Sequence, residues 1–142
     1  MMFLLDTNAV SELRKGRRSP SALPIVEWAE KVDEGALFVS AITILELEIG
    51  VRRIERKDKA QGVVLRHWLD DMVRPTFAGR ILPVDEAVAV ACASFHVPDP
   101  AAERDALIAA TAIVHGLSVV TRNVADFVRT GVPLINPWET EL

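Results

Sequence analysis

Aromatic residues are scarce in this sequence of 142 residues: they make up 6% of it, and tyrosine is absent. Proteins commonly hold single-stranded nucleic acid without sequence preference by stacking bases on aromatic side chains, so an extended stacking surface is not expected here. Positive charge is also in deficit, with a formal net charge of −4 at pH 7. This balance argues against broad, charge-driven binding of nucleic acid, although it permits basic patches around an acidic site.

Cysteine is almost absent as well, because Cys92 is the single one. A disulfide within the chain is therefore impossible, which favours a reducing compartment. The apolar run around Cys92, AVAVACASF, predicts a buried small side chain. No apolar run approaches the ~20 residues that cross a bilayer, and the run before Asp6 is too short for a signal peptide. We expect a cytoplasmic protein without membrane contact.

A glycine-rich turn is missing after the first predicted strand, which argues against a Rossmann or P-loop nucleotide binder. The strand ends instead in Asp6-Thr7-Asn8. A haloacid-dehalogenase-like phosphatase needs a second aspartate where Asn8 stands. A phosphoacceptor response regulator needs a lysine after a late strand, and Arg122 is a poor substitute.

The stretch from Asp105 to Phe127, DALIAATAIVHGLSVVTRNVADF, organises the rest of the chain. Ala106 to Val114 is apolar apart from one threonine, which predicts a helix buried on most faces. Gly116 is a stop signal, and the β-type run that follows predicts a buried strand ending in a turn at Arg122-Asn123.

Strands and helices alternate along the remainder of the chain. We predict strands at 2–5, 36–39, 80–84, 117–121 and 132–135, and helices at 9–14, 21–32, 41–56, 59–73 and 85–96. Thr7 or Asn8 is the expected cap of the first helix and Ser40 that of the third, while Asp99-Pro100 is a start signal for the buried helix. This order indicates an α/β fold with a mostly parallel central sheet of about five strands flanked by helices.

Four carboxylates follow or flank these strands. Asp6 ends the first strand, Asp126 follows the fourth, Asp105 begins the helix before it, and Glu46 lies on the helix after the second. Ligands bind at the carboxyl edge of open parallel sheets, so these side chains can converge there. Clustered carboxylates raise one another's pKa unless a cation neutralises them. An oxygen-only ligand set suits Mg²⁺ or Mn²⁺.

Each acid also has a purely structural alternative. Asp6 is placed to cap the first helix, and Asp126 to share a cap with Asn123. Asp105 is in the first turn of a helix, where the dipole favours an acid, and Glu46 has the alternative of a surface charge. The joint placement of the acids, rather than any one of them, favours a functional site.

The motifs resemble a known family. They are Asp6-Thr7-Asn8 with Ser11-Glu12-Leu13, the segment from Ser40 to Leu47 with Gly50, Asp105 to Ala112, and Val120 to Asn123 with Asp126-Phe127. Together they are similar to PIN-domain ribonucleases, specifically the VapC-type toxins of bacterial toxin–antitoxin pairs, to which FitB proteins also belong. The resemblance covers essentially the whole chain and implies a three-layer PIN fold in a single domain, residues 1–142.

The resemblance also implies a mechanism and partners. In the family, the positions matching Asp6, Glu46, Asp105 and Asp126 form the metal-binding catalytic cluster, and those matching Thr7, Asn8, Thr121 and Asn123 support it. The implied protein is an Mg²⁺- or Mn²⁺-dependent endoribonuclease that is inhibited by a cognate antitoxin, contacts DNA only through that antitoxin, and forms a homodimer. Glu103 is an alternative to Asp105 as the acid that faces the metal, and the register of the DALIAATA run favours Asp105.

An all-acid site repels phosphate, so nearby cations must reverse the local field. The candidates are Arg14, Lys15, Arg17, Arg18, Arg52, Arg53 and Arg56. The alternative for each of them is a solvated position on a helix end or loop, with no role in the site. For a homodimer, the helices within 41–73 offer surplus apolar surface at Trp68 and Leu69. The non-enzyme alternative is an inactive PIN-fold binding module, against which the presence of all four acids argues.

Overall fold

The structure, a computed structural model, describes residues 1–139 and is built on a five-stranded sheet of order β3-β2-β1-β4-β5. Every strand pair in it is parallel, so the predicted mostly parallel sheet of about five strands is confirmed. β3 is an edge strand and ends immediately before Pro83, which has no N–H to donate to a sheet. The strands are β1 (Phe3–Leu5), β2 (Leu37–Ser40), β3 (Ile81–Leu82), β4 (Ser118–Val120) and β5 (Leu134–Ile135).

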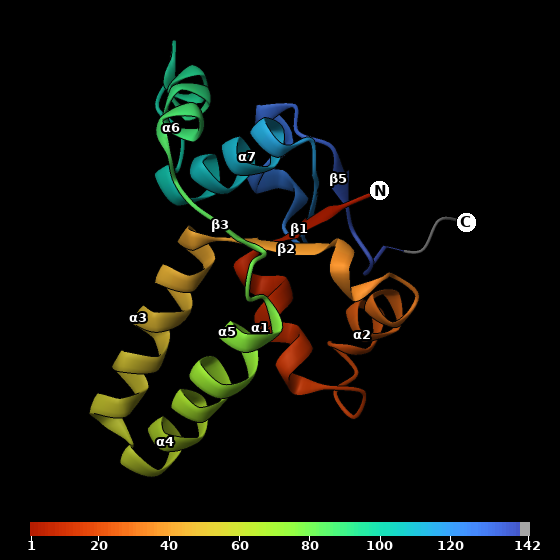
Figure 1. Cartoon of the computed structure of the whole chain (residues 1–142), viewed down its shortest axis with the longest axis vertical. Helices are drawn as coiled ribbons and strands as arrows, with labels where there is room; N and C mark the ends of the chain where they lie inside the picture. The colour runs from red at the N-terminus through yellow and green to blue at the C-terminus, as the bar shows by residue number, and fades with distance from the viewer. Residues whose placement is uncertain (140–142) are drawn as a thin grey trace.

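Helices cover both faces of the sheet and give the molecule three layers (Figure 1). On one face lie α1 (Thr7–Lys15), α2 (Leu23–Glu30), α3 (Ala41–Lys57), α4 (Lys59–His67) and α5 (Arg74–Thr76), and on the other lie α6 (Glu86–Ala93) and α7 (Glu103–His115). Shorter turns are the π-helix η2 (Trp68–Val73) and the 3-10 segments η1 (Glu34–Ala36), η3 (Ser94–His96), η4 (Val124–Asp126) and η5 (Val128–Thr130). No helix within residues 1–139 has the length and apolar character needed to cross a membrane.

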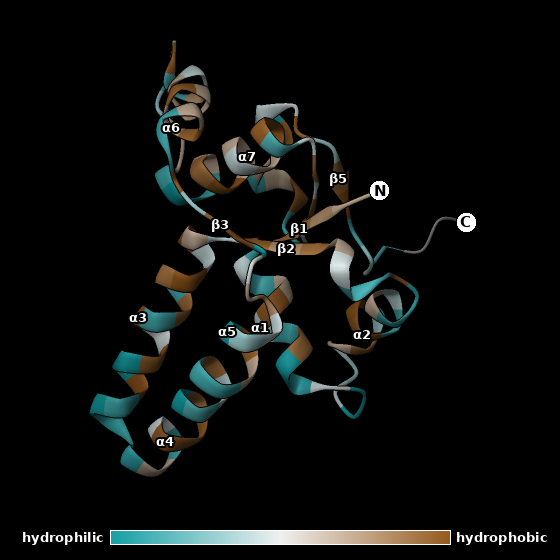
Figure 2. Ribbon diagram, in the orientation of Figure 1, coloured by the Kyte–Doolittle hydropathy of each residue, from teal (hydrophilic) through white to brown (hydrophobic). Residues whose placement is uncertain are grey.

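The central strand β1 joins the two halves of the core. Its side chains alternate between faces, so Phe3 and Leu5 pack with α1 and α2, whereas Leu4 packs with Ile108 of α7. All three are buried, as expected for a parallel strand covered on both sides, and the strands are the hydrophobic centre of Figure 2. Cys92 is buried on α6, as predicted.

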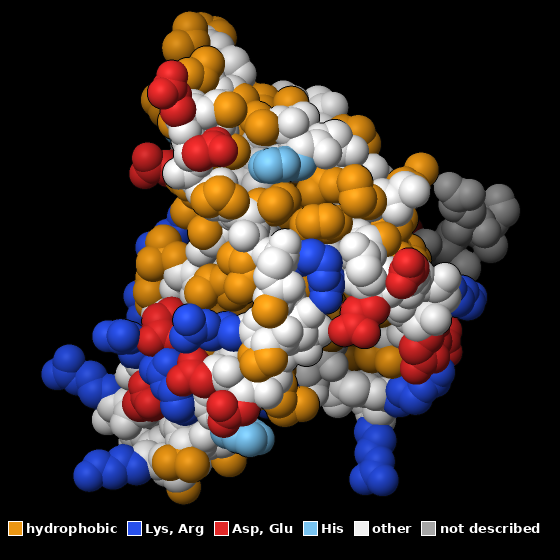
Figure 3. Space-filling model, in the orientation of Figure 1, with side chains coloured by type: hydrophobic (Ala, Val, Ile, Leu, Met, Phe, Trp, Pro, Cys, Tyr) orange, Lys and Arg blue, Asp and Glu red, His pale blue; other side chains and the backbone are white. Residues whose placement is uncertain are grey.

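Helices α3 and α4 form a hairpin that extends away from the sheet (Figure 1). Arg66 on α4 bridges Glu48 and Glu55 on α3, with N–O distances of 2.8 Å to each, within the charged cluster visible in Figure 3. Gly62 lets the helices approach closely. Beyond α4, Leu69 in η2 is fully buried in the core. Leu69 therefore contributes no surface for a second copy, and that part of the homodimer argument is wrong.

Two of the predicted helix starts are wrong. The cap of α1 is Asp6, whose Oδ1 accepts a hydrogen bond from the Ala9 N–H at 2.8 Å, rather than Thr7 or Asn8. Helix α7 begins at Glu103 instead of at Asp99-Pro100, because the carbonyls of that segment accept hydrogen bonds from the Arg129 guanidinium. The predicted cap by Ser40 is confirmed, since its Oγ accepts from the Ile42 N–H at 3.0 Å.

Substituting alanine for Gly62 tests the close packing of the hairpin. A Cβ there would lie 2.6 Å from the Glu55 Cα, so we expect overpacking to lower the free energy of unfolding by about 1–3 kcal/mol. Gly50 is the matched control within α3, because a Cβ there meets no atom within 4 Å. Gly50→Ala should be neutral or raise that free energy by up to about 1 kcal/mol. Urea denaturation of both variants measures this, and equal stabilities would contradict the packing.

Candidate active site

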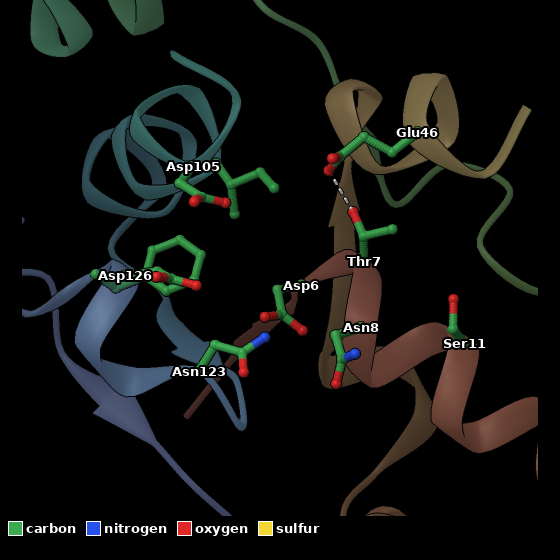
Figure 4. A pocket seen from close by; sticks show the side chains of 10 residues that line it. Asp6, Thr7, Asn8, Ser11, Glu46, Asp105, Asn123 and Asp126 are labelled. Atoms are coloured by element: carbon green, nitrogen blue, oxygen red, sulfur yellow. Dashed lines mark hydrogen bonds between the residues drawn. The ribbon is translucent and has the colours of Figure 1, made fainter. Parts of the chain in front are cut away.

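The candidate site lies where the two central strands end. Leu5 of β1 pairs with Val120 of β4, and the Asp6 N–H continues the ladder to the Val120 carbonyl at 3.1 Å. Beyond these ends is a pocket of about 280 Å³ (Figure 4). Its lining is Asp6, Thr7, Asn8, Ser11, Glu46, Asp105, Ile108, Asn123, Asp126 and Phe127, and we call it the acid pocket. It contains all four of the carboxylates that the sequence analysis singled out.

The carboxylates reach the acid pocket from three directions. Asp105 in the first turn of α7 and Asp126 at the end of η4 stand on one side, and Glu46 of α3 stands opposite them (Figure 4). Asp6 lies between the two sides, at the junction of β1 and α1. The pocket is therefore assembled from segments that are more than a hundred residues apart in the chain.

Asp6 is the most perturbed of these acids. Its side chain is 5% exposed, and burial raises its pKa from 3.8 to about 6. Hydrogen bonds from the Thr121 side chain and the Ala9 N–H oppose that rise, while the charges of Asp105 and Glu46 add to it. The capping role and the site role of Asp6 thus coexist in one carboxylate.

Asp105 is also shifted: burial raises its pKa, and the neighbouring charges of Asp126 and then Glu46 raise it further. Of the two alternatives in this segment, Asp105 lines the acid pocket, whereas the charge of Glu103 acts on the Cys92 thiol of α6. Asp105 is thus on the face of α7 that points to the acid pocket, and its role there stays a prediction.

Three of the four polar residues predicted to support the site line the acid pocket, and the fourth is buried behind it. Thr7 donates to Glu46 Oε1 at 2.7 Å (Figure 4). Its hydroxyl is also 3.1 Å from that of Thr43. Asn8 and Asn123 line the acid pocket directly. Thr121 is buried behind it, where its Oγ1 accepts the Asn123 N–H at 2.9 Å and shapes the turn.

Ser11 lines the acid pocket too, although it was not among the predicted site residues. It lies three residues after Asn8 on α1, and residues at that spacing share one helix face. That spacing was the available signal.

The predicted cations do not line the acid pocket. Lys15 pairs with Glu12 at 2.8 Å, Arg17 with Glu30 at 2.5 Å, and Arg52 with Glu48 at 2.8 Å. Within residues 1–139, the cation paired with a pocket acid is Arg104, which was not among the predicted cations: its Nη1 lies 3.9 Å from Glu46 Oε2. Its position beside Asp105 in the first turn of α7 was the signal for it.

A divalent metal ion suits the donor set of this pocket. The ligating atoms available are carboxylate, hydroxyl and amide oxygens, which hard cations prefer. The raised pKa values of Asp6 and Asp105 show carboxylates whose charge a cation would stabilise. Within residues 1–139, no three acidic, histidine or cysteine side chains are gathered closely enough to form a ready-made metal site.

Replacing Asp6 with asparagine tests the cost of its buried charge. A pKa raised from 3.8 to about 6 means that this group's contribution to stability is complete below pH 3.8 and is lost as the pH rises through about 6. The loss is roughly 3 kcal/mol for two pKa units. Asparagine keeps the N-cap oxygen, so Asp6→Asn in EDTA should be more stable than the wild type at pH 7.5 by about 1–3 kcal/mol.

Urea denaturation at pH 4 and pH 7.5 measures that difference. The two proteins should approach each other in stability at pH 4, where the carboxylate of the wild type is protonated in the folded state. A difference in stability between the two proteins that is the same at pH 4 and at pH 7.5 would contradict the buried-charge interpretation.

Comparisons with known proteins agree with this geometry. The family model of the PIN domain matches residues 3–132. Toxin FitB of Neisseria gonorrhoeae is 38% identical over 143 residues, covering 96% of this chain and 99% of FitB. VapC ribonuclease Y4jK of Sinorhizobium fredii is 35% identical over 146 residues, covering 97% of this chain and 99% of Y4jK.

Solved structures give the same relationship. The crystal structure of FitAcB from Neisseria gonorrhoeae matches with a TM-score of 0.87 and 37% identity, covering 98% of this chain and 100% of that one. The structure of FitAB bound to an IR36 DNA fragment matches with a TM-score of 0.85 and 35% identity, covering 99% of each chain. The resemblance expected from the sequence motifs is confirmed, and the chain belongs to the PIN domain family.

Proposed function

We propose that this chain is an Mg²⁺- or Mn²⁺-dependent endoribonuclease that acts as the toxin of a toxin–antitoxin pair. The observation that carries the proposal is the acid pocket, in which four carboxylates from separate segments meet at the carboxyl edge of the sheet. Support comes from the relatives, one of which is called a toxin and another a VapC ribonuclease. The alternative of an inactive binding module accounts less well for all four acids lining one pocket, because the N-cap of α1 requires only Asp6.

The residues divide the chemistry among them. Asp6, Asp105 and Asp126 would hold the ion, which when bound supplies Lewis acidity toward a phosphate oxygen and a more acidic water. Glu46 has one carboxylate oxygen fixed by the Thr7 hydroxyl, which leaves Oε2 to bind the ion or to accept a proton. The amides of Asn8 and Asn123, both on the pocket wall, are placed to donate hydrogen bonds to substrate oxygens.

Cleavage of RNA is the direct test. Purified protein incubated with total RNA should produce fragments in Mg²⁺ or Mn²⁺ and none in EDTA. Asp105→Asn should reduce the rate of cleavage by at least about 100-fold, because replacing even the residues that orient metal ligands typically costs about 10–100-fold in metal affinity or activity. Asp99→Asn, an exposed change outside the acid pocket, is the matched control and should retain activity. Cleavage that survives chelation, or cleavage of DNA alone, rules the proposal out.

An antitoxin partner is the second part of the proposal. The FitAcB and FitAB structures are those of complexes, one of them bound to DNA. In this chain a hollow shares Thr7, Asn8, Ser11 and Glu46 with the acid pocket and continues between α1 and the α3–α4 hairpin. Its far wall is apolar, formed by Leu47, Val51, Ile54, Leu65 and Trp68. A partner segment that folds into this groove can bring an arginine to the carboxylates in place of the metal.

Competition between partner and metal tests that arrangement. Glu46→Ala and Asp126→Ala should weaken antitoxin affinity roughly tenfold or more, because each removes an acceptor for the partner's cation. Added Mg²⁺ should weaken antitoxin binding to the wild type. Isothermal titration of the antitoxin against all three proteins, with and without Mg²⁺, provides the measurement. Equal affinities throughout would mean that the partner blocks RNA from another surface.

The homodimer also stays a prediction, and the structure changes where its surface is expected. Helix α6 carries no charge after Glu86, yet only Val88 and Cys92 on it are buried. Val90 on its outer face is 68% exposed and Val97 beyond it is 75% exposed. A helix that is apolar all round is normally covered, and an uncharged face can meet its own copy without repulsion. We therefore move the proposed dimer surface from Trp68 and Leu69 to α6.

A further inference from the structure

The acid pocket presents a phosphate with an electrostatic problem. Its ten lining residues include four acids and no lysine, arginine or histidine. An RNA strand that brings its phosphate to the carboxyl edge therefore approaches like charges on both sides. A bound cation offsets part of this repulsion at the floor of the pocket, but the phosphate also needs a positive group at the mouth.

Arg104 lies beside the acid pocket, within reach of one of its acids. It precedes Asp105 in the first turn of α7, and its guanidinium reaches across to Glu46 of α3, with Nη1 3.9 Å from Oε2. Within residues 1–139 this is the one ion pair that involves any of the four pocket acids. The Arg104 side chain is 53% exposed, so it is accessible to a ligand.

The contact of Arg104 with Glu46 is easily exchanged. At 3.9 Å it is an ion pair without a hydrogen bond, and half-exposed pairs of this kind contribute little to stability. Other guanidinium groups are fixed: that of Arg66 is held by Glu48 and Glu55, and that of Arg129 by backbone carbonyls. Arg104 therefore keeps its N–H donors for another partner.

We propose that Arg104 binds a phosphate of the RNA strand at the mouth of the acid pocket and leaves Glu46 as it does so, an inference that rests on the proposed ribonuclease function. The planar guanidinium matches two phosphate oxygens with parallel, charge-assisted hydrogen bonds, which are stronger than the long pair it gives up. Its departure frees Glu46 Oε2 for a cation or a proton. Arrival of RNA and completion of the acid site are thereby coupled through one side chain.

The experiment compares Arg104→Gln with Arg74→Gln. Arg74 is a close match, because it is 58% exposed and pairs with Asp70 at 3.7 Å, but its partner Asp70 does not line the acid pocket, whereas Glu46 does. A fluorescent single-stranded RNA oligonucleotide is titrated in EDTA at several salt concentrations, so that no cleavage intervenes. Arg104→Gln should bind roughly tenfold more weakly than wild type at low salt. Its plot of log affinity against log salt should be shallower by about 0.7, the slope of one phosphate contact.

Arg74→Gln should leave both affinity and slope at wild-type values. Arg104→Lys should keep the wild-type slope and recover only part of the affinity, because lysine has the charge without the planar fork. Equal melting temperatures confirm that the variants are folded. The inference is overturned if Arg104→Gln matches Arg74→Gln in affinity and slope while the wild type binds and cleaves RNA. Wild-type protein that neither binds nor cleaves RNA overturns the proposed function as well.

Discussion

The buried carboxylate of Asp6 is the interaction on which the rest of the structure depends. Its backbone N–H closes the ladder between β1 and β4, its Oδ1 caps α1, and its charge forms the floor of the acid pocket. One residue thus ends the central strand, starts the first helix and supplies the most desolvated charge of the site. Because these roles share one position, the site cannot move relative to the sheet without breaking the fold beside it.

The charges around the acid pocket lower the free energy of unfolding of the chain. Burial and mutual repulsion raise the pKa values of Asp6 and Asp105, while most arginines are occupied elsewhere, as in the Arg66 cluster of the hairpin. A cation that binds the folded chain alone therefore stabilises it by mass action, whether it is a metal ion or a partner's side chain. The half-exposed Arg104 is an incomplete internal substitute for such a cation.

The sequence predicted those features that a local pattern determines. Apolar runs located the strands, Ser40 marked the start of α3, and the positions of the acids after strand ends predicted their convergence. It failed where distant contacts decide. The Asp99-Pro100 start signal is overridden by Arg129, thirty residues later in the chain, and Leu69 is buried in a core cluster with residues of distant segments such as Leu5 and Val39. Arg104 was missed because its partner, Glu46, lies on another helix.

The strand order has a consequence for how the protein is made. β1 is the first strand of the chain, but it pairs with β4 through contacts such as Phe3 with Ser118, and the pocket closes only with Asp126. Since domains form as the chain emerges from the ribosome, the first half is synthesised with one side of its central strand unpaired and with two of its four acids missing. Whatever reaction the pocket performs, a chain that has not yet been synthesised as far as Asp126 lacks the means to perform it.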